Sequence, residues 1–293
     1  MNIAVFSDIH GNHAALQACI DYCVAKGITT FILLGDYVTD CPYPEKTIEK
    51  INILRNYFKC YMVKGNREEY LINYRKNGCT GWKKGSASGA LLYTYENLQN
   101  DDLELFDSLP IYELIDEKGM DKIEICHGSP ANASEPLFPD KRNMKRTLVH
   151  LKADILLHGH SHIQGTYIYR GKKAINPGSV GLPWYHGGKT QFAILHSSAS
   201  GWDEEMVQLD YDRQAILDDF ESSGIMKSAP AWAAVTMHTI RTGVDLNQIV
   251  LLNAMRLCEV ERGEVHWPDI PEKYWAISLR ENNIDLYGND ITD

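Results

Sequence analysis

Five short apolar segments of this chain each end at a polar turn that carries aspartate, asparagine or histidine. The turns are Asp8-Ile9-His10, Gly35-Asp36, Gly65-Asn66-Arg67-Glu68, His127-Gly128-Ser129 and Gly159-His160-Ser161-His162. The apolar segments before them are too short for helices and predict buried strands. Because ligands of an open α/β sheet bind at the carboxyl ends of its strands, we expect these polar residues to meet at one edge.

The pattern of apolar residues predicts a mixed α/β (α+β) fold. Helical patterns separate the first three strands, and this alternation is typical of a parallel sheet covered by helices. Later strands come in pairs around short turns and predict antiparallel hairpins. The predicted strands are 3–6, 30–34, 59–63, 111–115, 122–126, 155–157, 164–169, 173–175 and 192–195.

Changes in composition divide the chain into a core and an extension. Residues 1–200 hold all five turns and form the predicted core. Within it, 78–109 is predicted to be an insertion: a loop rich in Gly, Ser and Lys, followed by one helix over 90–109. We expect 201–293 to add a strand and helices packed on the core, with 263–293 wrapping along the surface.

Charge and hydropathy exclude several classes of protein. The 29 Lys and Arg against 39 Asp and Glu give a net charge of −10, which disfavours a stable complex with nucleic acid. No apolar run has the roughly 18 residues needed to cross a membrane. The chain begins in a strand pattern without an export signal, and its seven cysteines have no framework spacing. We therefore expect a cytoplasmic protein with reduced thiols.

The polar turns offer the ligands of a metal centre. Each turn alone has a simpler explanation, since Asp caps helices, Asn occupies turns and His bonds to backbone groups. Five turns at corresponding strand ends favour a shared site. Imidazole, carboxylate and amide groups without thiolate suit Mn, Fe, Co or Zn. Seven such side chains exceed the needs of one ion and match two ions about 3.5–4 Å apart that activate water and hold a phosphoryl group.

These motifs, in this order, resemble those of the calcineurin-like metallophosphoesterases. The resemblance extends from Met1 to Leu195, and residues 175–181 are similar to a stretch in the small bacterial and archaeal phosphodiesterases and diadenosine-tetraphosphate hydrolases of that superfamily. It implies a four-layer α/β/β/α double β-sandwich. It also implies that Asp36 bridges two divalent ions. One ion would be held by Asp8, His10, Asp36 and His162, and the other by Asp36, Asn66, His127 and His160.

Arg67 departs from the common family pattern, which has His after Gly-Asn. The guanidinium cannot usefully donate a proton, but it can bind two phosphate oxygens. Without a general acid, hydrolysis of esters with a poor alkoxide leaving group is disfavoured. The alternative for Arg67 is a surface ion pair with Glu68 or Glu69.

The resulting hypothesis is a phosphoesterase in which a hydroxide bridging two metal ions attacks phosphodiesters or nucleoside polyphosphates, with diadenosine tetraphosphate as one candidate. Asp36, Asn66, Arg67 and His127 are the predicted catalytic residues. Trp184 and Tyr185 are predicted to contact a small phosphoester or nucleotide, although packing under loops explains them equally well. His13 is interpreted as a solvated residue at a helix start. Two alternatives stay open: a phosphomonoesterase of the Ser/Thr protein phosphatase type, and a non-catalytic binding scaffold. The sequence leaves the oligomeric state open.

Overall fold

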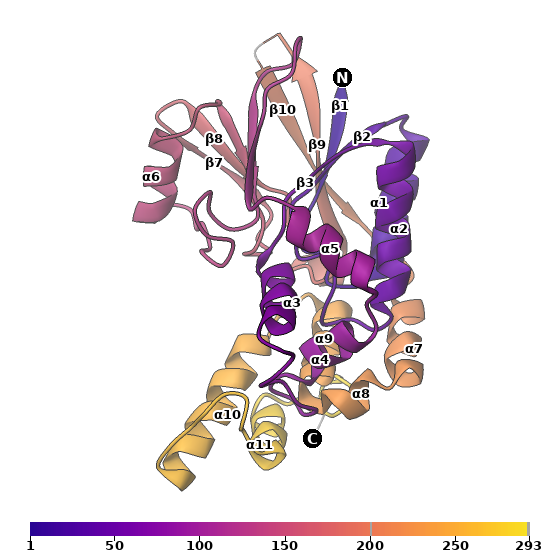
Figure 1. Ribbon diagram of the computed structural model, residues 1–293, viewed down its shortest axis with the longest axis vertical. Coiled ribbons are helices and arrows are strands. Elements are labelled where there is room, and N and C mark those ends of the chain that lie inside the picture. Colours follow the sequence, from indigo (N-terminus) through magenta and orange to yellow (C-terminus); the bar gives the residue numbers. More distant parts are fainter. Residues whose placement is uncertain (200, 292–293) are drawn as a thin grey trace.

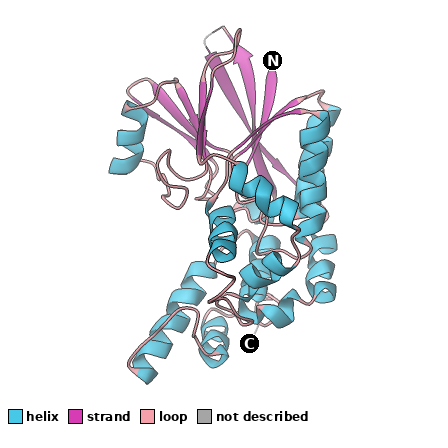
Figure 2. Ribbon diagram, viewed as in Figure 1, coloured by secondary structure: helices cyan, strands magenta, loops and turns pink. Residues whose placement is uncertain are grey.

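The computed structural model describes residues 1–199 and 201–291, which form two five-stranded sheets and a set of surrounding helices (Figure 2). The strands are β1 (Asn2–Phe6), β2 (Thr30–Leu33), β3 (Lys59–Met62), β4 (Tyr112–Ile115), β5 (Ile123–Cys126), β6 (Ile155–Leu157), β7 (Gly165–Tyr169), β8 (Lys172–Asn176), β9 (Thr190–Ser198) and β10 (Gly201–Leu209). The helices are α1 (His13–Ala25), α2 (Pro44–Tyr57), α3 (Asn66–Lys76), α4 (Gly89–Glu96), α5 (Asn100–Ser108), α6 (Arg142–Val149), α7 (Arg213–Ser223), α8 (Ile225–Ser228), α9 (Pro230–Thr242), α10 (Asn247–Arg262), α11 (Glu272–Glu281) and a 3₁₀ turn, His186–Gly188.

Both sheets mix parallel and antiparallel pairs. The first has the order β10-β9-β1-β2-β3, with β1, β2 and β3 parallel and β9 and β10 antiparallel to their neighbours. The second has the order β4-β5-β6-β8-β7, in which β5, β6 and β8 run parallel between two antiparallel edge strands. The carboxyl ends of β1, β2 and β3 therefore share one edge, as the sequence predicts.

The two sheets face each other across an apolar layer. Ile3, Val5 and Ile32 of the first sheet pack in one cluster with Ile125 and Leu157 of the second. Each such side chain contributes roughly 1.5–3 kcal/mol when it is fully buried. A second cluster lies between the first sheet and α1, α2 and α5, and a third between the second sheet and α6. Figure 1 shows α1 and α2 on one side of the molecule and α6 on the other. The layers are helix, sheet, sheet, helix, which confirms the predicted fold.

Residues after the sheets form a helical layer against one end of the core. Figure 1 shows α7 to α11 gathered below the sheets. Leu182 and Tyr93 of the core share an apolar cluster with Phe220 of α7 and Ile240 of α9. None of the described helices is long and apolar enough to span a membrane.

Two predicted elements differ from the structure. The single helix predicted over 90–109 is wrong, because α4 ends at Glu96 and α5 begins at Asn100 with a new capping box from Asp102. The surface wrap predicted for 263–293 is also wrong over α11, whose Tyr274 and Trp275 are each 1% exposed. They pack against α9 and α10 in a separate apolar cluster.

Candidate metal centre

The five polar turns converge at the end of the sandwich nearest the helical layer. Asp8 and His10 follow β1, Asp36 lies just beyond β2, Asn66 begins α3, His127 follows β5, and His160 and His162 follow β6. Neighbouring turns are joined through the backbone, since His10 N donates to Asp36 O and Gly159 N donates to His127 O. Loops from both sheets thus build one site.

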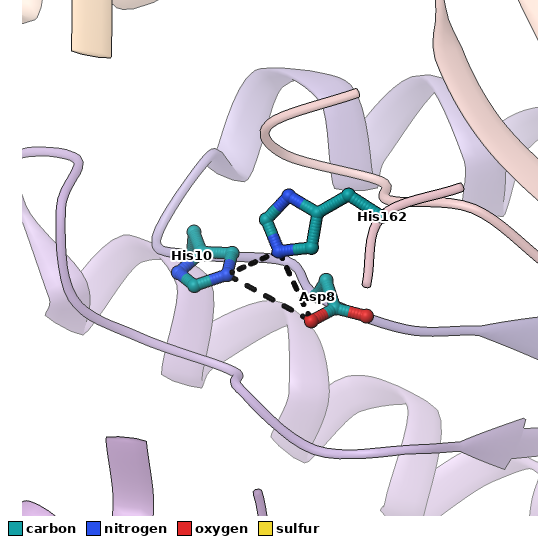
Figure 3. A group of neighbouring side chains, drawn as sticks. All are labelled: Asp8, His10 and His162. Carbon is teal, nitrogen blue, oxygen red and sulfur yellow. Dashed lines mark hydrogen bonds and ion pairs between the residues drawn. The ribbon is translucent and has the colours of Figure 1, made fainter. Parts of the chain in front are cut away.

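One group of possible ligands contains Asp8, His10 and His162. Figure 3 shows their side chains pointing toward one another. Asp8 Oδ1 lies 3.2 Å from His162 Nε2 and 3.9 Å from His10 Nε2, and the two imidazole nitrogens are 3.1 Å apart. These atoms are close enough to share one cation.

A second group contains Asp36, His127 and His160, whose ligand atoms also lie within 4.8 Å of one another. His127 Nε2 is 3.4 Å from Asp36 Oδ2 and 3.1 Å from Asn66 Oδ1. Asp36 Oδ2 is also 3.7 Å from His10 Nε2, so this carboxylate lies between the two groups. The structure therefore brings together all seven residues that the sequence singles out as ligands.

Hydrogen bonds fix which imidazole nitrogen faces the centre. His127 Nδ1 donates to Leu34 O and His162 Nδ1 donates to Leu182 O, each over 2.8 Å. His10 Nδ1 donates to Asp40 Oδ2 over 2.7 Å. Because a carbonyl or carboxylate oxygen only accepts, these Nδ1 atoms carry protons, and the Nε2 atoms are the ones that face Asp8 and Asp36.

The donor set fits divalent cations. Asp8 is fully buried, and its Oδ1 has no hydrogen-bond partner among the described residues, although three imidazoles surround it. A buried carboxylate oxygen without a partner is costly unless a cation balances it. Burial alone would raise the pKa of Asp8, but His162 and His127 outweigh burial and hold it far below its usual value.

The two histidines of the second group differ in charge. Burial opposes protonation of His127, but Asp36 and Asp8 outweigh it and raise its pKa to about 10. Burial lowers the pKa of His160 to about 4, with His127 adding to the effect. The excess negative charge of the carboxylates thus holds a proton on His127, at the position that a metal ion would take over.

The loops carrying Asp36 and Asn66 are in backbone contact. A Cβ on Gly35 would lie 2.4 Å from Gly65 N, and one on Gly65 would lie 2.1 Å from Asp36 Oδ1. Buried Glu68 joins the same loops by accepting the backbone N–H groups of Asp36, Tyr37 and Gly65 over 2.7–2.8 Å. Glycine at both positions is what allows Asp36 and Asn66 to approach each other.

Arg67 faces the centre and does not pair with Glu68 or Glu69. Its Nη2 lies 3.5 Å from Asp40 Oδ2 and its Nε lies 4.0 Å from Asp36 Oδ2. These distances are those of ion pairs without a close hydrogen bond. The surface ion pair considered from the sequence is therefore wrong. Burial would lower the pKa of Arg67, but Asp40 and Asp36 raise it, so the guanidinium stays charged. Its buried Nε–H has no hydrogen-bond partner in the described chain.

A cavity of about 300 Å³ opens onto the centre. Trp184 lines it with His10, Asp36, Asn66, Arg67, His160 and His162 on one side and Trp232, Asp245 and Leu251 of the helical layer on the other. Tyr185 is 63% exposed and is not part of this lining. The structure thus brings Trp184 to the site and leaves Tyr185 outside the cavity.

Sequence reasoning missed the roles of four residues of this region: Asp40, Trp232, Asp245 and Glu68. Asp40 accepts from His10 and also from Trp232 Nε1, the latter over 2.6 Å. Asp245 accepts from Trp184 Nε1 over 3.0 Å, and Glu68 joins the loops. Asp40 lies four residues after Asp36 in the sequence. Its closeness to a predicted ligand could have marked it as a site residue. Nothing in the local sequence marks Trp232 or Asp245.

The calcineurin-like phosphoesterase superfamily domain matches residues 1–200. The chain belongs to this superfamily. As a member, it is a phosphoester hydrolase.

One protein is similar to this phosphoesterase in sequence, and two solved structures are similar to it in fold. It is 32% identical over 227 residues to an uncharacterized protein of Methanocaldococcus jannaschii, covering 72% of this chain and 88% of the relative. A hypothetical protein of Pyrococcus horikoshii has the same fold, with a TM-score of 0.70, 22% identity and coverage of 83% of this chain and 99% of that one. A metallophosphoesterase of Sphaerobacter thermophilus has a TM-score of 0.66 at 22% identity, over 83% and 100% of the two chains.

Proposed function

We propose that this phosphoesterase hydrolyses small phosphodiesters or nucleoside polyphosphates, including diadenosine tetraphosphate, with two divalent cations at the centre. The observation that carries the proposal is the convergence of seven ligand side chains beside a charged guanidinium whose Nε–H has no hydrogen-bond partner among the described residues. When bound, the two cations would activate a water molecule and neutralise the phosphoryl oxygens.

The ligands divide into two sets that share Asp36. Asp8, His10 and His162 surround one position, and Asn66, His127 and His160 surround the other. The donor chemistry admits Mn, Fe, Zn or Co, because every donor is oxygen or imidazole nitrogen and none is a thiolate. The hydrogen bonds from the Nδ1 atoms hold the imidazoles ready to bind without rearrangement.

Arg67 determines which esters are favoured. Its guanidinium lies at the mouth of the centre and can hold the phosphoryl oxygens as negative charge develops on them. It does not release a proton at neutral pH, so it cannot protonate a departing alkoxide. Substrates whose leaving group departs as a stable anion, such as a phosphoanhydride or an aryl ester, are therefore preferred to phosphoserine in a protein.

The test is a panel of substrates assayed with chelator-treated protein and added Mn²⁺, Fe²⁺, Zn²⁺ or Co²⁺. The panel contains bis(4-nitrophenyl) phosphate, diadenosine tetraphosphate and a phosphoserine peptide. We expect wild type to prefer the first two. Asp36→Asn should abolish the metal-dependent activity, while the exposed control Asp21→Asn keeps wild-type activity. Preference for the phosphopeptide would support the monoesterase alternative, and absence of metal binding in equilibrium dialysis would support the scaffold.

Arg67→His in the same panel tests the leaving-group argument. A histidine at this position can act as a general acid, which typically accelerates such reactions 10²–10⁴-fold. We expect the ratio of kcat/KM for the phosphopeptide to that for bis(4-nitrophenyl) phosphate to rise about tenfold or more. Arg67→Lys, which keeps the charge, should leave that ratio low. An equal ratio in wild type and Arg67→His would contradict the argument.

A further inference from the structure

A second cavity, of about 500 Å³, adjoins the one at the metal centre. Asp40, Arg67, Trp232 and Leu251 line both cavities, so the second one begins where the first one ends. It lies between α3, the segment 80–91 and the C-terminal helices. Its size is within the range of pockets that hold small ligands, which is roughly 300–1,000 Å³. We refer to it as the aromatic pocket.

Five aromatic side chains line the aromatic pocket. They are Tyr70, Tyr74, Trp82, Trp232 and Trp267. Trp82 stacks on Tyr74 with ring centroids 4.1 Å apart and planes at 4°, so each ring covers one face of the other. A planar ring in the pocket can extend this stack on the remaining face of the half-buried Trp82.

The pocket offers little charge beyond the part it shares with the metal centre. Among the described residues, its charged lining consists of Asp40 and Arg67, both at the junction. The polar side chains of Asn73, Asn77 and Thr80 lie at its exposed rim. A polyphosphate needs several cationic groups, and this lining does not supply them. An uncharged planar group with polar edges fits it better.

The wall formed by residues 80–91 is fixed to the C-terminal helices. Glu272 of α11 accepts the N–H of Ser86 over 2.7 Å and its hydroxyl over 2.6 Å. Ser86 Oγ in turn accepts Ala231 N of α9, and Gly85 N donates to Ser228 O. These contacts hold the pocket open as a defined cavity rather than a gap beneath a loose loop.

We propose that the aromatic pocket binds a planar aromatic group of the substrate, a nucleobase in a nucleotide ester, while the attached phosphate lies at the metal centre beside Arg67. The inference rests on the proposed function and adds the place where substrate selection occurs. Trp232 and Leu251 of its lining come from beyond residues 1–200, the part of the chain that matches the superfamily.

The test measures binding of two probes that differ only by the base. Adenosine 5′-monophosphate and ribose 5-phosphate are titrated into the full chain by calorimetry, once after chelator treatment and once with Mn²⁺. We expect the nucleotide to bind at least about fivefold more tightly, the lower end of what stacking of one base provides. Trp82→Ala should remove about that factor for the nucleotide and leave ribose 5-phosphate within twofold.

Further variants separate a local effect from misfolding. Trp267→Ala, at a position 47% exposed, should also weaken nucleotide binding. Trp82→Phe keeps an aromatic ring, so it should bind the nucleotide more tightly than Trp82→Ala does and almost as tightly as wild type. Tyr57→Ala, at a position 79% exposed, is the matched aromatic control and should bind as wild type does. Equal affinity for the two probes, or nucleotide binding unaffected by both tryptophan variants, would overturn the proposal.

Hydrolysis of bis(4-nitrophenyl) phosphate by the same preparations distinguishes this proposal from the proposed function. Base-dependent binding without metal-dependent hydrolysis would support the aromatic pocket and contradict the function. Hydrolysis without base-dependent binding would support the function and overturn the pocket.

Discussion

Asp40 connects the metal ligands to the helical layer through a single carboxylate. One oxygen accepts from His10 Nδ1 and Thr39 Oγ1, and the other accepts from Trp232 Nε1. Arg67 lies 3.5 Å from it. The orientations of His10, Arg67 and Trp232 therefore all depend on Asp40. Asp40 itself belongs to neither group of possible metal ligands.

We expect Asp40→Asn to weaken metal binding about 10–100-fold, the usual effect of losing a carboxylate that orients a ligating histidine. The affinity is measured by competition with a chromophoric chelator. Trp232→Phe removes the indole N–H and part of the ring but leaves the bond from His10 to Asp40, so it should lower the affinity much less. Affinities that match wild type in Asp40→Asn would show that His10 needs no such support. A melting curve for each variant checks that it folds.

Local sequence predicts the strands and their polar ends but not the contacts that join distant helices. The turns at Asp8, Asp36 and His127 can be predicted because a buried strand followed by a polar turn is a short-range pattern. The bond from Trp232 to Asp40 spans 192 residues, and no periodicity encodes it. In α11, Trp275 follows a stretch that contains Pro268 and Pro271, so its segment resembles a surface tail although tertiary packing buries it.

Helix α7 is attached to the core by Asp219. Its carboxylate accepts from His13 Nε2 over 2.6 Å and from Lys46 Nζ over 2.8 Å. His13 is thus paired and only 14% exposed, so its interpretation as a solvated residue is wrong. Burial opposes the ionisation of Asp219, but the hydrogen bonds from Lys46 and His13 outweigh it and lower its pKa below the usual value.

This lowered pKa gives a pH-dependent contribution to stability. Because the folded state holds the proton of Asp219 less tightly than the unfolded chain, the contribution is complete above the unfolded pKa of about 3.9 and disappears as the pH falls below it. Asp219→Asn should therefore lower the free energy of unfolding in urea at pH 7 and have less effect at pH 3. Asp218→Asn, at an exposed neighbour, should have little effect at either pH. If Asp219→Asn lowered the free energy of unfolding equally at both pH values, the stabilisation would not come from the ionised carboxylate of Asp219.

At the scale of the whole molecule, residues 201–291 are joined to the core by a strand as well as by packed helices. Strand β10 pairs with β9 along nine residue pairs and completes the first sheet. Phe220 and Ile240 share an apolar cluster with Leu182 and Tyr93 of the core. Separation of the two parts would expose this cluster to water.

We therefore expect the full chain to unfold in one cooperative transition. Scanning calorimetry should give a single peak whose calorimetric and van't Hoff enthalpies agree. Chelator-treated and Mn²⁺-loaded protein should both show one peak, at a higher temperature when loaded, since a ligand that binds only the folded state stabilises it. Two resolved peaks would instead indicate that residues 201–293 melt independently.

The crossing of the loops at Gly35 and Gly65 has a consequence for anyone screening variants of this chain. Neither position has a functional group to offer, yet any replacement there would push apart the strands of backbone that carry Asp36 and Asn66. A mutational scan scored by turnover would rank both glycines alongside the ligands themselves. Only a scan scored in parallel by cation uptake and by protein abundance would tell the residues that do chemistry from those that merely leave room for it.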